Sequence, residues 1–305
     1  MLFAHMTTTS LLQSILHPTA ERRGVRLLLW RDDLLHPDLP GNKARKLKYN
    51  LLAAREQGHT RLLTFGGAYS NHLAAVAAAG RLHGFETVGL VRGEEHQVLN
   101  PTLARCVADS MQLHYLDRTT YRRRAEPEFL EQLQTRFGPA YLLPEGGTNA
   151  LALRGVAELI GELRQHTDFD AVAVAAGTGG TLAGLALGLA EAQYPARVVG
   201  VAALKGGDFL RTEIDELTQS VVGQTLTNYE LHTSYHFGGY AKLPAELRAF
   251  IGQFEADFGV LLDPIYTGKL LAGVLDLIAL GHFAQGSTVV AVHTGGLQAW
   301  AGFLQ

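Results

Sequence analysis

Lys43 stands in a segment whose residue types favour anion binding and nucleophilic chemistry. It belongs to the segment Gly41–Asn50, which follows the strand-like run Val25–Trp30, and apolar residues recur after it at helical spacing. Lys43 is therefore expected at the opening of a helix, beside backbone N–H groups that lack an intrahelical partner and attract anions. Desolvation and nearby cations lower the pKa of a lysine in such a site, which makes its amine a nucleophile. A plain solvated or phosphate-facing lysine is the alternative that this segment alone leaves open.

A second segment, Thr64–His72, joins a strand to a helix through glycines and ends in polar side chains. The run Leu73–Ala79 that follows is rich in small apolar residues, and Ser70 or Asn71 is expected to cap this helix. Open α/β sheets bind ligands at the carboxyl ends of their strands, so the Ser70 hydroxyl and the Asn71 amide are candidates to face a ligand. An ordinary helix cap without a ligand is the alternative.

A third segment places a glycine-rich turn directly after a buried strand. The apolar run Ala171–Ala176 leads into Gly177-Thr178-Gly179-Gly180-Thr181, and a helix is expected from Leu182. A glycine turn before a helix N-terminus suits a phosphate group. It is not a P-loop, since no Lys-Ser/Thr pair follows the glycines, and it lacks the fingerprint of dinucleotide-binding folds. A tight turn without a ligand is equally compatible with these residues.

Two C-terminal segments add hydroxyl groups to this set. Tyr266 lies in the segment Leu262–Lys269, directly before an expected helix. Thr294 follows an expected strand and precedes two glycines in the segment Val290–Gly296. Both segments therefore present a hydroxyl group where an element begins or ends.

Together the four segments resemble the pyridoxal-phosphate enzymes of fold type II, in particular the 1-aminocyclopropane-1-carboxylate (ACC) deaminase and D-cysteine desulfhydrase family. The resemblance spans nearly the whole chain, from Arg31-Asp32-Asp33-Leu34 to His293-Thr294-Gly295-Gly296. It implies an α/β protein of two parallel-sheet domains, similar to the tryptophan synthase β-subunit, with pyridoxal 5'-phosphate between them. Residues 1–48 and 148–305 would form the large domain, and residues 49–147 the small one.

The resemblance also implies roles for individual residues. Lys43 matches the lysine that holds the cofactor as a Schiff base, and Ser70 matches a hydroxyl that transfers protons beside the substrate carboxylate. Tyr266 matches an active-site tyrosine over the substrate, and Tyr240 is assigned as a second one. The further cofactor-binding residues implied are Lys46, Asn71, Gly177, Thr178, Gly179, Gly180, Thr181, Thr267 and Thr294. The substrate contacts implied are Ser70, Asn71, His72, Tyr240 and Tyr266.

One departure from the family pattern bears on the reaction. Deaminase-type members carry a glutamate at the pyridine nitrogen of the cofactor, where this chain has Thr267, and Thr294 offers a further hydroxyl. A carboxylate would keep the ring nitrogen protonated and a hydroxyl would not, so the ring is a weaker electron sink. Opening a cyclopropane demands a strong sink, and His72 fits the desulfhydrase pattern. β-Elimination from a cysteine-like amino acid is therefore favoured, with ACC deamination and a dehydratase-type elimination from D-serine or an L-amino acid as alternatives.

The mechanism that the resemblance implies begins when the substrate amine displaces Lys43 from the cofactor. Released Lys43, or Ser70, removes the α-proton, and the cofactor delocalises the resulting charge. The β-substituent then leaves, and hydrolysis yields a keto acid and ammonia. The Ser70 hydroxyl and adjacent N–H groups would hold the substrate carboxylate, while Tyr266 would orient the substrate or assist the leaving group.

Composition is typical of a globular α/β protein. The chain has 305 residues, of which 47% are apolar and 18% charged, so it can bury a large core. The formal net charge of −3 argues against a nucleic-acid partner, and the basic run Arg122–Arg124 is expected to be a solvated helix face. The single cysteine, Cys106, excludes an intrachain disulfide and is expected to be buried. His232 and His236 have H-x-x-x-H spacing without further ligands close by in sequence, so no metal is expected.

Strand-like and helix-like segments alternate along the chain, which predicts parallel sheets covered by helices on both faces. No apolar run reaches membrane-spanning length, and residues 1–13 lack the features of a signal peptide, so a cytoplasmic enzyme is expected. The family resemblance adds a homodimer that acts on a small amino acid. The expected strands are Arg26–Trp30, Arg61–Phe65, Thr87–Val91, Leu113–Leu116, Tyr141–Leu143, Ala171–Ala175, Val198–Ala202 and Thr288–Val292.

Two hypotheses from other functional classes compete with a pyridoxal-phosphate enzyme. A binding protein that kept the fold and lost turnover would not need Lys43, Ser70, Asn71 and Tyr266, all of which are present. A dinucleotide-binding oxidoreductase built on the glycines at 177–180 gives no account of Lys43. The enzyme hypothesis is therefore favoured over both.

Overall fold

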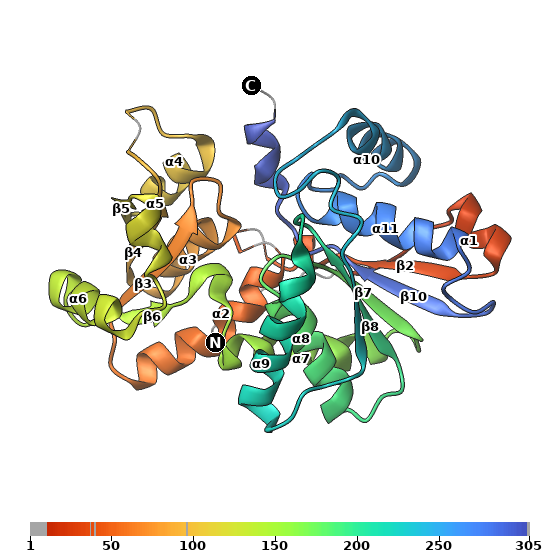
Figure 1. The fold of residues 1–305 in the computed structure, drawn as a ribbon, viewed down its shortest axis with the longest axis horizontal. Coiled ribbons are helices and arrows are strands. Elements are labelled where there is room, and N and C mark those ends of the chain that lie inside the picture. The colour runs from red at the N-terminus through yellow and green to blue at the C-terminus, as the bar shows by residue number, and fades with distance from the viewer. Residues whose placement is uncertain (1–10, 37, 40, 96, 304–305) are drawn as a thin grey trace.

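The computed structural model of the chain describes residues 11–36, 38–39, 41–95 and 97–303. Its elements form two lobes, each built on a sheet of its own (Figure 1). The six-stranded sheet has the order β1-β2-β10-β7-β8-β9, and the four-stranded sheet has the order β5-β4-β3-β6. The strands are β1 (Leu12–Ser14), β2 (Arg26–Trp30), β3 (Arg61–Gly67), β4 (Glu86–Arg92), β5 (Met111–Leu116), β6 (Tyr141–Leu143), β7 (Ala171–Ala176), β8 (Arg197–Ala202), β9 (Tyr229–His232) and β10 (Thr288–Val292).

Helices alternate with these strands along the chain. The α-helices are α1 (Pro18–Arg23), α2 (Asn42–Glu56), α3 (Asn71–His83), α4 (Pro101–Ala108), α5 (Arg118–Arg122), α6 (Pro127–Phe137), α7 (Ala150–Arg164), α8 (Gly180–Glu191), α9 (Leu210–Val222), α10 (Ala245–Phe258) and α11 (Thr267–Ala279). Short 3-10 turns span Asp32–Leu34 (η1), Glu145–Gly147 (η2), Gly207–Phe209 (η3) and Leu297–Gly302 (η4). None of the helices in the described part of the chain is both long and apolar enough to cross a membrane.

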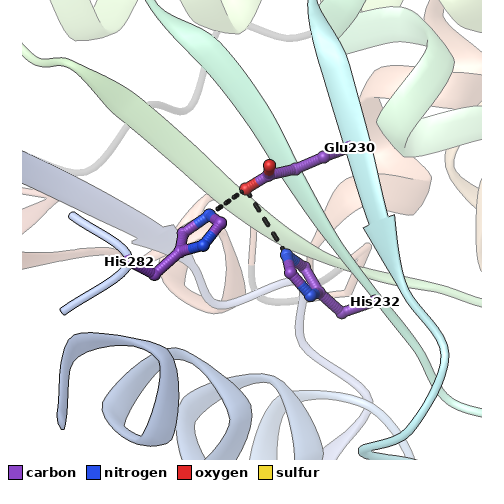
Figure 2. Close-up of side chains that lie close together, drawn as sticks. All are labelled: Glu230, His232 and His282. Atoms are coloured by element: carbon purple, nitrogen blue, oxygen red, sulfur yellow. Dashed lines mark hydrogen bonds and ion pairs between the residues drawn. The ribbon is translucent and has the colours of Figure 1, made fainter. Parts of the chain in front are cut away.

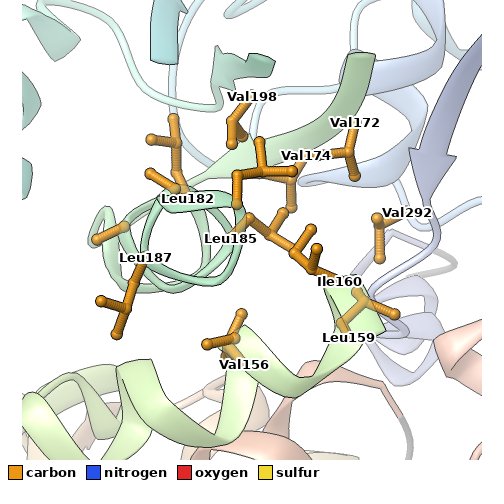
Figure 3. Packing of buried hydrophobic residues seen from close by; sticks show 14 of the residues in the cluster. Val156, Leu159, Ile160, Val172, Val174, Leu182, Leu185, Leu187, Val198 and Val292 are labelled. Atoms are coloured by element: carbon orange, nitrogen blue, oxygen red, sulfur yellow. The ribbon is translucent and has the colours of Figure 1, made fainter. Parts of the chain in front are cut away.

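The large lobe buries its sheet on both faces. Every residue of β7 is buried, as expected for a central parallel strand that helices cover on two sides. On one face, Val172 and Val174 of β7 pack against α7 and α8, through residues such as Ile160 and Leu185 (Figure 3). On the other face, α1, α10 and α11 complete a second apolar cluster. The carboxyl ends of these strands are thereby held as a rigid platform for the loops that follow them.

The small lobe uses the same three-layer arrangement. Apolar residues of α3 and α4, including Cys106, pack on one face of the four-stranded sheet. Residues of α5 and α6, such as Tyr121 and Phe129, pack on the other face. β3 pairs in parallel with both β4 and β6. Its carboxyl end at Gly67 is followed by a short turn that leads to the start of α3. This arrangement places Ser70 and Asn71 at the edge of the small lobe.

Helix α2 joins the two lobes. Its later residues Leu47, Leu51 and Ala54 belong to the apolar cluster of the small lobe. Its first turns contact the large lobe through Arg45, whose side chain pairs with Asp32 and Glu162. The domain boundary between residues 48 and 49 falls inside this helix, so the division into residues 49–147 and the remainder stays a proposal.

The sequence located the central strands and missed the edges of the large sheet. All eight expected strands form, and three of them, β2, β6 and β10, have the expected bounds. The two strands without a sequence prediction, β1 and β9, lie at opposite edges of the six-stranded sheet. β1 runs antiparallel to β2, unlike the parallel pairing expected throughout. Both are short and partly exposed, so they lack the continuous apolar run that marks a buried strand.

Candidate active site

A cavity of about 960 Å³ is lined by loops of both lobes. All but one of the site residues expected from the sequence line it; these are Lys43, Lys46, Ser70, Asn71, His72, Gly177, Thr178, Gly179, Gly180, Thr181, Tyr240, Tyr266 and Thr294. Segments separated by more than two hundred residues in the chain therefore converge on one volume. The exception is Thr267.

Lys43 and Lys46 meet at a single carbonyl oxygen. Lys43 is the second residue of α2, and its Nζ donates a hydrogen bond to the Gly146 carbonyl oxygen at 3.2 Å. Lys46 Nζ donates to the same oxygen at 3.3 Å and to Thr148 Oγ1 at 3.1 Å. Burial lowers the pKa of Lys43 to about 8. Burial and the charge of Lys43 hold the pKa of Lys46 well below its usual range. Part of the Lys43 population is therefore a free amine near neutral pH.

A buried ion network fixes the helix that carries both lysines. Arg45 Nη2 lies 2.9 Å from Asp32 Oδ1, and its Nη1 lies 2.7 Å from Glu162 Oε1. Trp30 Nε1 donates a further hydrogen bond to Asp32 at 2.8 Å. Helix α7 approaches closely, since a Cβ atom at Gly155 would lie 2.1 Å from the Arg45 carbonyl oxygen. These contacts tie the first turn of α2 to the large lobe.

Ser70 and Asn71 begin helix α3 at the rim of the small lobe. The Ser70 hydroxyl oxygen caps the helix by accepting hydrogen bonds from the N–H groups of His72 and Leu73, at 3.2 and 3.3 Å. Ser70 lines the cavity, and no acceptor for its own proton is found among the residues that the structure describes. Asn71 Oδ1 accepts a hydrogen bond from Gln298 Nε2 at 2.7 Å, which fixes the orientation of the amide. The cap expected from the sequence and a ligand-facing position therefore coincide.

His72 lies beneath the cavity. Its side chain is 2% exposed, and its Nε2 lies 2.8 Å from Thr64 Oγ1. Because Thr64 donates its own proton to the Leu143 carbonyl oxygen, the His72 Nε2 must be the donor in this contact. Burial, with the charges of Lys43 and Lys46, holds the pKa of His72 well below its usual range, so the ring is neutral.

The glycine-rich turn presents a helix N-terminus to the cavity. Gly179 precedes α8 with φ +74°, and no side chain caps this helix. A Cβ atom at Gly180 would lie 2.6 Å from the Thr148 side chain and 3.0 Å from Lys46 Nζ, so only glycine fits between them. Thr181 accepts a hydrogen bond from Asn42 Nδ2 at 2.7 Å. Uncapped N–H groups beside a lysine form a fitting cradle for a phosphate group.

Two tyrosines pair at another wall of the cavity. The hydroxyl groups of Tyr240 and Tyr266 lie 3.4 Å apart, with an interplanar angle of 67°. Burial, followed by the neighbouring Tyr240, raises the pKa of Tyr266 well above its usual range. Tyr266 therefore stays protonated and can donate a hydrogen bond at all physiological pH values. A Cβ atom at Gly177 would lie 2.9 Å from the Tyr266 ring, so the glycine turn accommodates the tyrosine.

Thr267 occupies a different place from the one that the resemblance implied. Its hydroxyl donates to Asp263 Oδ2 at 2.7 Å and accepts from the Asp263 N–H at 2.8 Å. Thr267 is fully buried and does not line the cavity. Its hydroxyl thus stabilises the start of α11, where the main chain doubles back on the Asp263 side chain. Thr294 does line the cavity, so it is the remaining candidate for the hydroxyl beside the ring nitrogen of the cofactor.

Three residues that were not expected in the site from the sequence also shape it. Arg124, expected on a solvated face, lines the cavity and lies 2.7 Å from Glu145. Gln298 positions Asn71, as described above. Lys269 is fully buried, and its Nζ donates to the carbonyl oxygens of Ala203 at 2.9 Å and Gly239 at 2.7 Å. The second bond holds the loop that carries Tyr240. No local motif could have found these residues, because their partners are distant in the chain.

Comparison with known proteins places these features in a wider group. A family model described as "Pyridoxal-phosphate dependent enzyme" matches residues 5–295. A Pyrococcus horikoshii protein named "Putative 1-aminocyclopropane-1-carboxylate deaminase" is 30% identical over 90% of this chain and 85% of its own length. A D-cysteine desulfhydrase of Yersinia pestis is 33% identical over 90% of this chain and 88% of its own. The crystal structure of an ACC deaminase homologue has a TM-score of 0.82 and 30% identity, covering 98% of this chain and 94% of that one.

Proposed function

Because the chain belongs to the family of pyridoxal-phosphate-dependent enzymes, we propose that it catalyses α,β-elimination from a small amino acid, with D-cysteine as the substrate. The single observation that carries the proposal is the placement of Lys43. Its amine, with a pKa of about 8, lies in one cavity with the Ser70 hydroxyl and the Tyr240–Tyr266 pair. An amine nucleophile, a proton-transfer hydroxyl and a neutral phenol are the groups that such an elimination uses.

The residues that line the cavity could bind both the phosphate end and the aldehyde end of pyridoxal phosphate. The N-terminus of α8, with Thr178, Thr181 and Lys46, would hold the phosphate group. Lys43 would hold the aldehyde carbon as a covalent anchor, and Asn71 would donate its amide to the ring hydroxyl. When bound, pyridoxal phosphate withdraws electrons from the α-carbon of the substrate, which makes the α-proton acidic.

The protein's own groups would then move protons and hold the substrate. Ser70 and the N–H groups at the start of α3 would bind the substrate carboxylate, where the positive end of the helix favours an anion. The neutral Nζ of Lys43 would accept the α-proton. Tyr266, which stays protonated, would donate a hydrogen bond to the departing sulfur. The balanced reaction converts D-cysteine and water into pyruvate, ammonia and hydrogen sulfide.

ACC deamination is the second candidate, and the relatives with that name support it. The side chains favour elimination from D-cysteine instead. Thr294, the hydroxyl residue that lines the cavity on this side, would stand where a ring-opening enzyme needs a carboxylate to keep the ring nitrogen protonated. Thr267 is in addition committed to Asp263. A weaker electron sink suffices when the leaving group departs as readily as a thiol.

The experiment that tests the proposal is an absorbance spectrum of the purified protein, recorded before and during addition of D-cysteine. We expect a band from the lysine-bound cofactor that shifts, with sulfide and pyruvate appearing in equal amounts. Borohydride reduction should attach the cofactor to Lys43, as peptide mass spectrometry would show. Lys43→Ala should fold, lose the band and lose turnover, whereas Lys48→Ala should retain both.

Each alternative has a distinct outcome in the same assay. Release of 2-oxobutanoate from ACC, without sulfide from D-cysteine, would replace the proposed reaction by deamination. A cofactor band with no product from any D- or L-amino acid would favour a non-catalytic binding protein. A protein that stays without a band after addition of pyridoxal phosphate would contradict the role of Lys43.

We further propose that the enzyme is a cytoplasmic homodimer. The family resemblance supports the dimer. A small amino-acid substrate fits the activities of the named relatives. Light scattering coupled to size-exclusion chromatography would test the dimer, since a mass near 33.0 kDa would identify a monomer.

A further inference from the structure

Glu230, His232 and His282 converge at the outer edge of the large lobe, away from the cavity (Figure 2). Glu230 and His232 are two residues apart on β9, so their side chains lie on the same face of this edge strand. His282 follows the end of α11, where its backbone N–H donates to the Leu277 carbonyl oxygen. Three residues from two elements thus direct their polar atoms toward one point.

The distances between these atoms are close to those of a metal site. Glu230 Oε1 lies 3.4 Å from His232 Nε2 and 2.6 Å from His282 Nε2. The donor atoms of all three residues lie within 4.8 Å of one another. A tetrahedral zinc ion, bound at about 2.0–2.2 Å, separates its ligand atoms by roughly 3.3 Å. The contact to His232 matches this value, and the His282 ring must move outward by about 0.7 Å as the ion replaces the shared proton.

The His232 nitrogen is the second observation that points to a ligand. His232 Nε2 is buried as an atom, and in the part of the chain that the structure describes its contact is the long 3.4 Å ion pair with Glu230 Oε1, which lacks the geometry of a hydrogen bond. A buried nitrogen without a hydrogen bond of good geometry is costly, and a bound ion or water would satisfy it. An ion bound by Glu230 Oε1 would do so. The other carboxylate oxygen, Oε2, lies 3.2 Å from Arg197, so it is already neutralised.

The surroundings are suited to a partly open site. The three side chains keep 22–27% of their surface exposed, which leaves room for entry of an ion and for water as a fourth ligand. Edge-to-face ring contacts hold the imidazoles in place. The ring centroids of His232 and His282 lie 5.2 Å apart, and those of His282 and Phe283 lie 5.1 Å apart. Two imidazoles and one carboxylate form a donor set that zinc uses in proteins.

We propose that Glu230, His232 and His282 bind one divalent transition-metal ion, with Zn²⁺ as the favoured ion. The ion would join the edge strand β9 to the segment after α11. The H-x-x-x-H spacing of His232 and His236 does not describe this site, because the partners of His232 are Glu230 and His282. The site is independent of the proposed amino-acid chemistry.

The test is metal titration of the cofactor-loaded protein. Zn²⁺ binding is measured by calorimetry, and Co²⁺ binding by its visible d–d absorption, which reports the geometry of the ligands. We expect one ion per chain, with an increase in melting temperature that a chelator reverses. His232→Ala and His282→Gln should each weaken binding at least about tenfold. Glutamine at position 282 retains a donor for Glu230, so the fold is preserved.

His236→Ala is the matched control, because it removes the second histidine of the sequence motif and leaves the three proposed ligands in place. It should bind metal as the wild type does. The proposal would be overturned by a wild-type protein that binds neither ion saturably. It would be overturned equally by His232→Ala and His282→Gln variants that bind with wild-type affinity. Melting temperatures in the presence of chelator confirm that each variant is folded when it is titrated.

Discussion

A Cβ atom at Gly41 would lie 1.8 Å from the carbonyl oxygen of Thr294. The start of α2 is thus seated directly on the loop that follows β10, and the Asn42 N–H donates to the same oxygen at 3.4 Å. Gly41 has φ +74°, a conformation that favours glycine. Lys43 therefore owes its position to a glycine whose contact partner is far away in the chain.

Gly41→Ala should displace the first turn of α2 and with it Lys43. We expect the elimination activity to fall about 100-fold, because a misplacement near 1 Å at a reacting group has an effect of that size. Gly58→Ala is the control. Gly58 has a similar φ of +75° just beyond the other end of α2, and a Cβ there meets nothing within 4 Å. It should cost about 1–2 kcal/mol of unfolding free energy and leave the activity intact. Equal activity losses in the two variants would contradict the role of the close contact.

The pH dependence of the cofactor-free protein should report the burial of Lys43. Its pKa falls from the ordinary 10.5 to about 8, because burial disfavours the charged form. The unfolded chain binds more protons than the folded one between these values, so the contribution of Lys43 to stability rises with pH from about 8 to 10.5. Below pH 8 the folded protein carries Lys43 in its charged form, so the full cost of burying that charge reduces the stability. Between pH 8 and 10.5 the melting temperature of the wild type should therefore rise relative to that of Lys43→Met. Lys269, whose pKa is also about 8, is present in both proteins and cancels in the difference. If the melting temperatures of wild type and Lys43→Met changed with pH in parallel, a lowered pKa of Lys43 would be contradicted.

Arg45→Met should destabilise the protein by about 3–5 kcal/mol, since it leaves the buried Asp32 carboxylate without its cationic partner. Chemical denaturation would measure this loss. Arg123→Met removes a half-exposed ion pair with Glu126 and should change stability by less than about 1 kcal/mol. A similar small effect in both variants would show that the Asp32 site tolerates an unpaired charge.

Lys269→Met should loosen the loop that carries Tyr240. Two buried carbonyl oxygens, those of Ala203 and Gly239, would lose their donor, at a cost of about 2–5 kcal/mol in unfolding free energy. We expect KM to rise more than kcat falls, because the loop carries Tyr240, which lines the cavity and is proposed to contact the substrate. Lys242→Met changes an exposed lysine of the same loop and should leave both constants unchanged. Identical kinetics in the Lys269 variant would limit that residue to a role in folding.

Thr294→Glu should raise the basicity of the cofactor ring nitrogen, because a carboxylate favours the protonated form. The absorbance spectrum of the bound cofactor should change, and ring opening of ACC should gain relative to elimination from D-cysteine. An unchanged spectrum would show that Thr294 does not face the ring nitrogen. Thr267→Glu is instead expected to destabilise the fold, since it would bury a second carboxylate against Asp263.

Local sequence signals were sufficient for much of the site. The cap of α3 and the glycine turn before α8 closely follow the strands β3 and β7, and the carboxyl ends of strands are ligand-binding positions in a parallel α/β fold. The lysine of α2 is predicted instead from its place at the start of a basic helix. The central strands were equally visible because they are continuous apolar runs. The edge strands β1 and β9 were missed, since a half-exposed strand of three or four residues has no distinctive periodicity.

Pairings between distant residues were out of reach. Arg45 joins Asp32, 13 residues away, and Glu162, 117 residues away, and neither spacing follows a local rule. Thr267 differs from its expected place for a local reason, because the resemblance implied a position beside the cofactor, whereas its hydroxyl pairs with Asp263, four residues before it. His232 was paired with His236 by spacing, whereas the fold placed His282 beside it. Contacts between distant residues can be predicted only once the order and pairing of the strands and helices are known.

Helix α2 carries a thermodynamic consequence for the whole molecule. One half of it completes the apolar cluster of the small lobe, and the other half holds Arg45 in the ion network of the large lobe. Melting of either half of α2 leaves the other half as a shorter and less stable helix, because helix formation is cooperative and depends on length. The unfolding free energies of the two lobes are therefore coupled through this helix, because unfolding of either lobe removes contacts that hold α2 in place for the other.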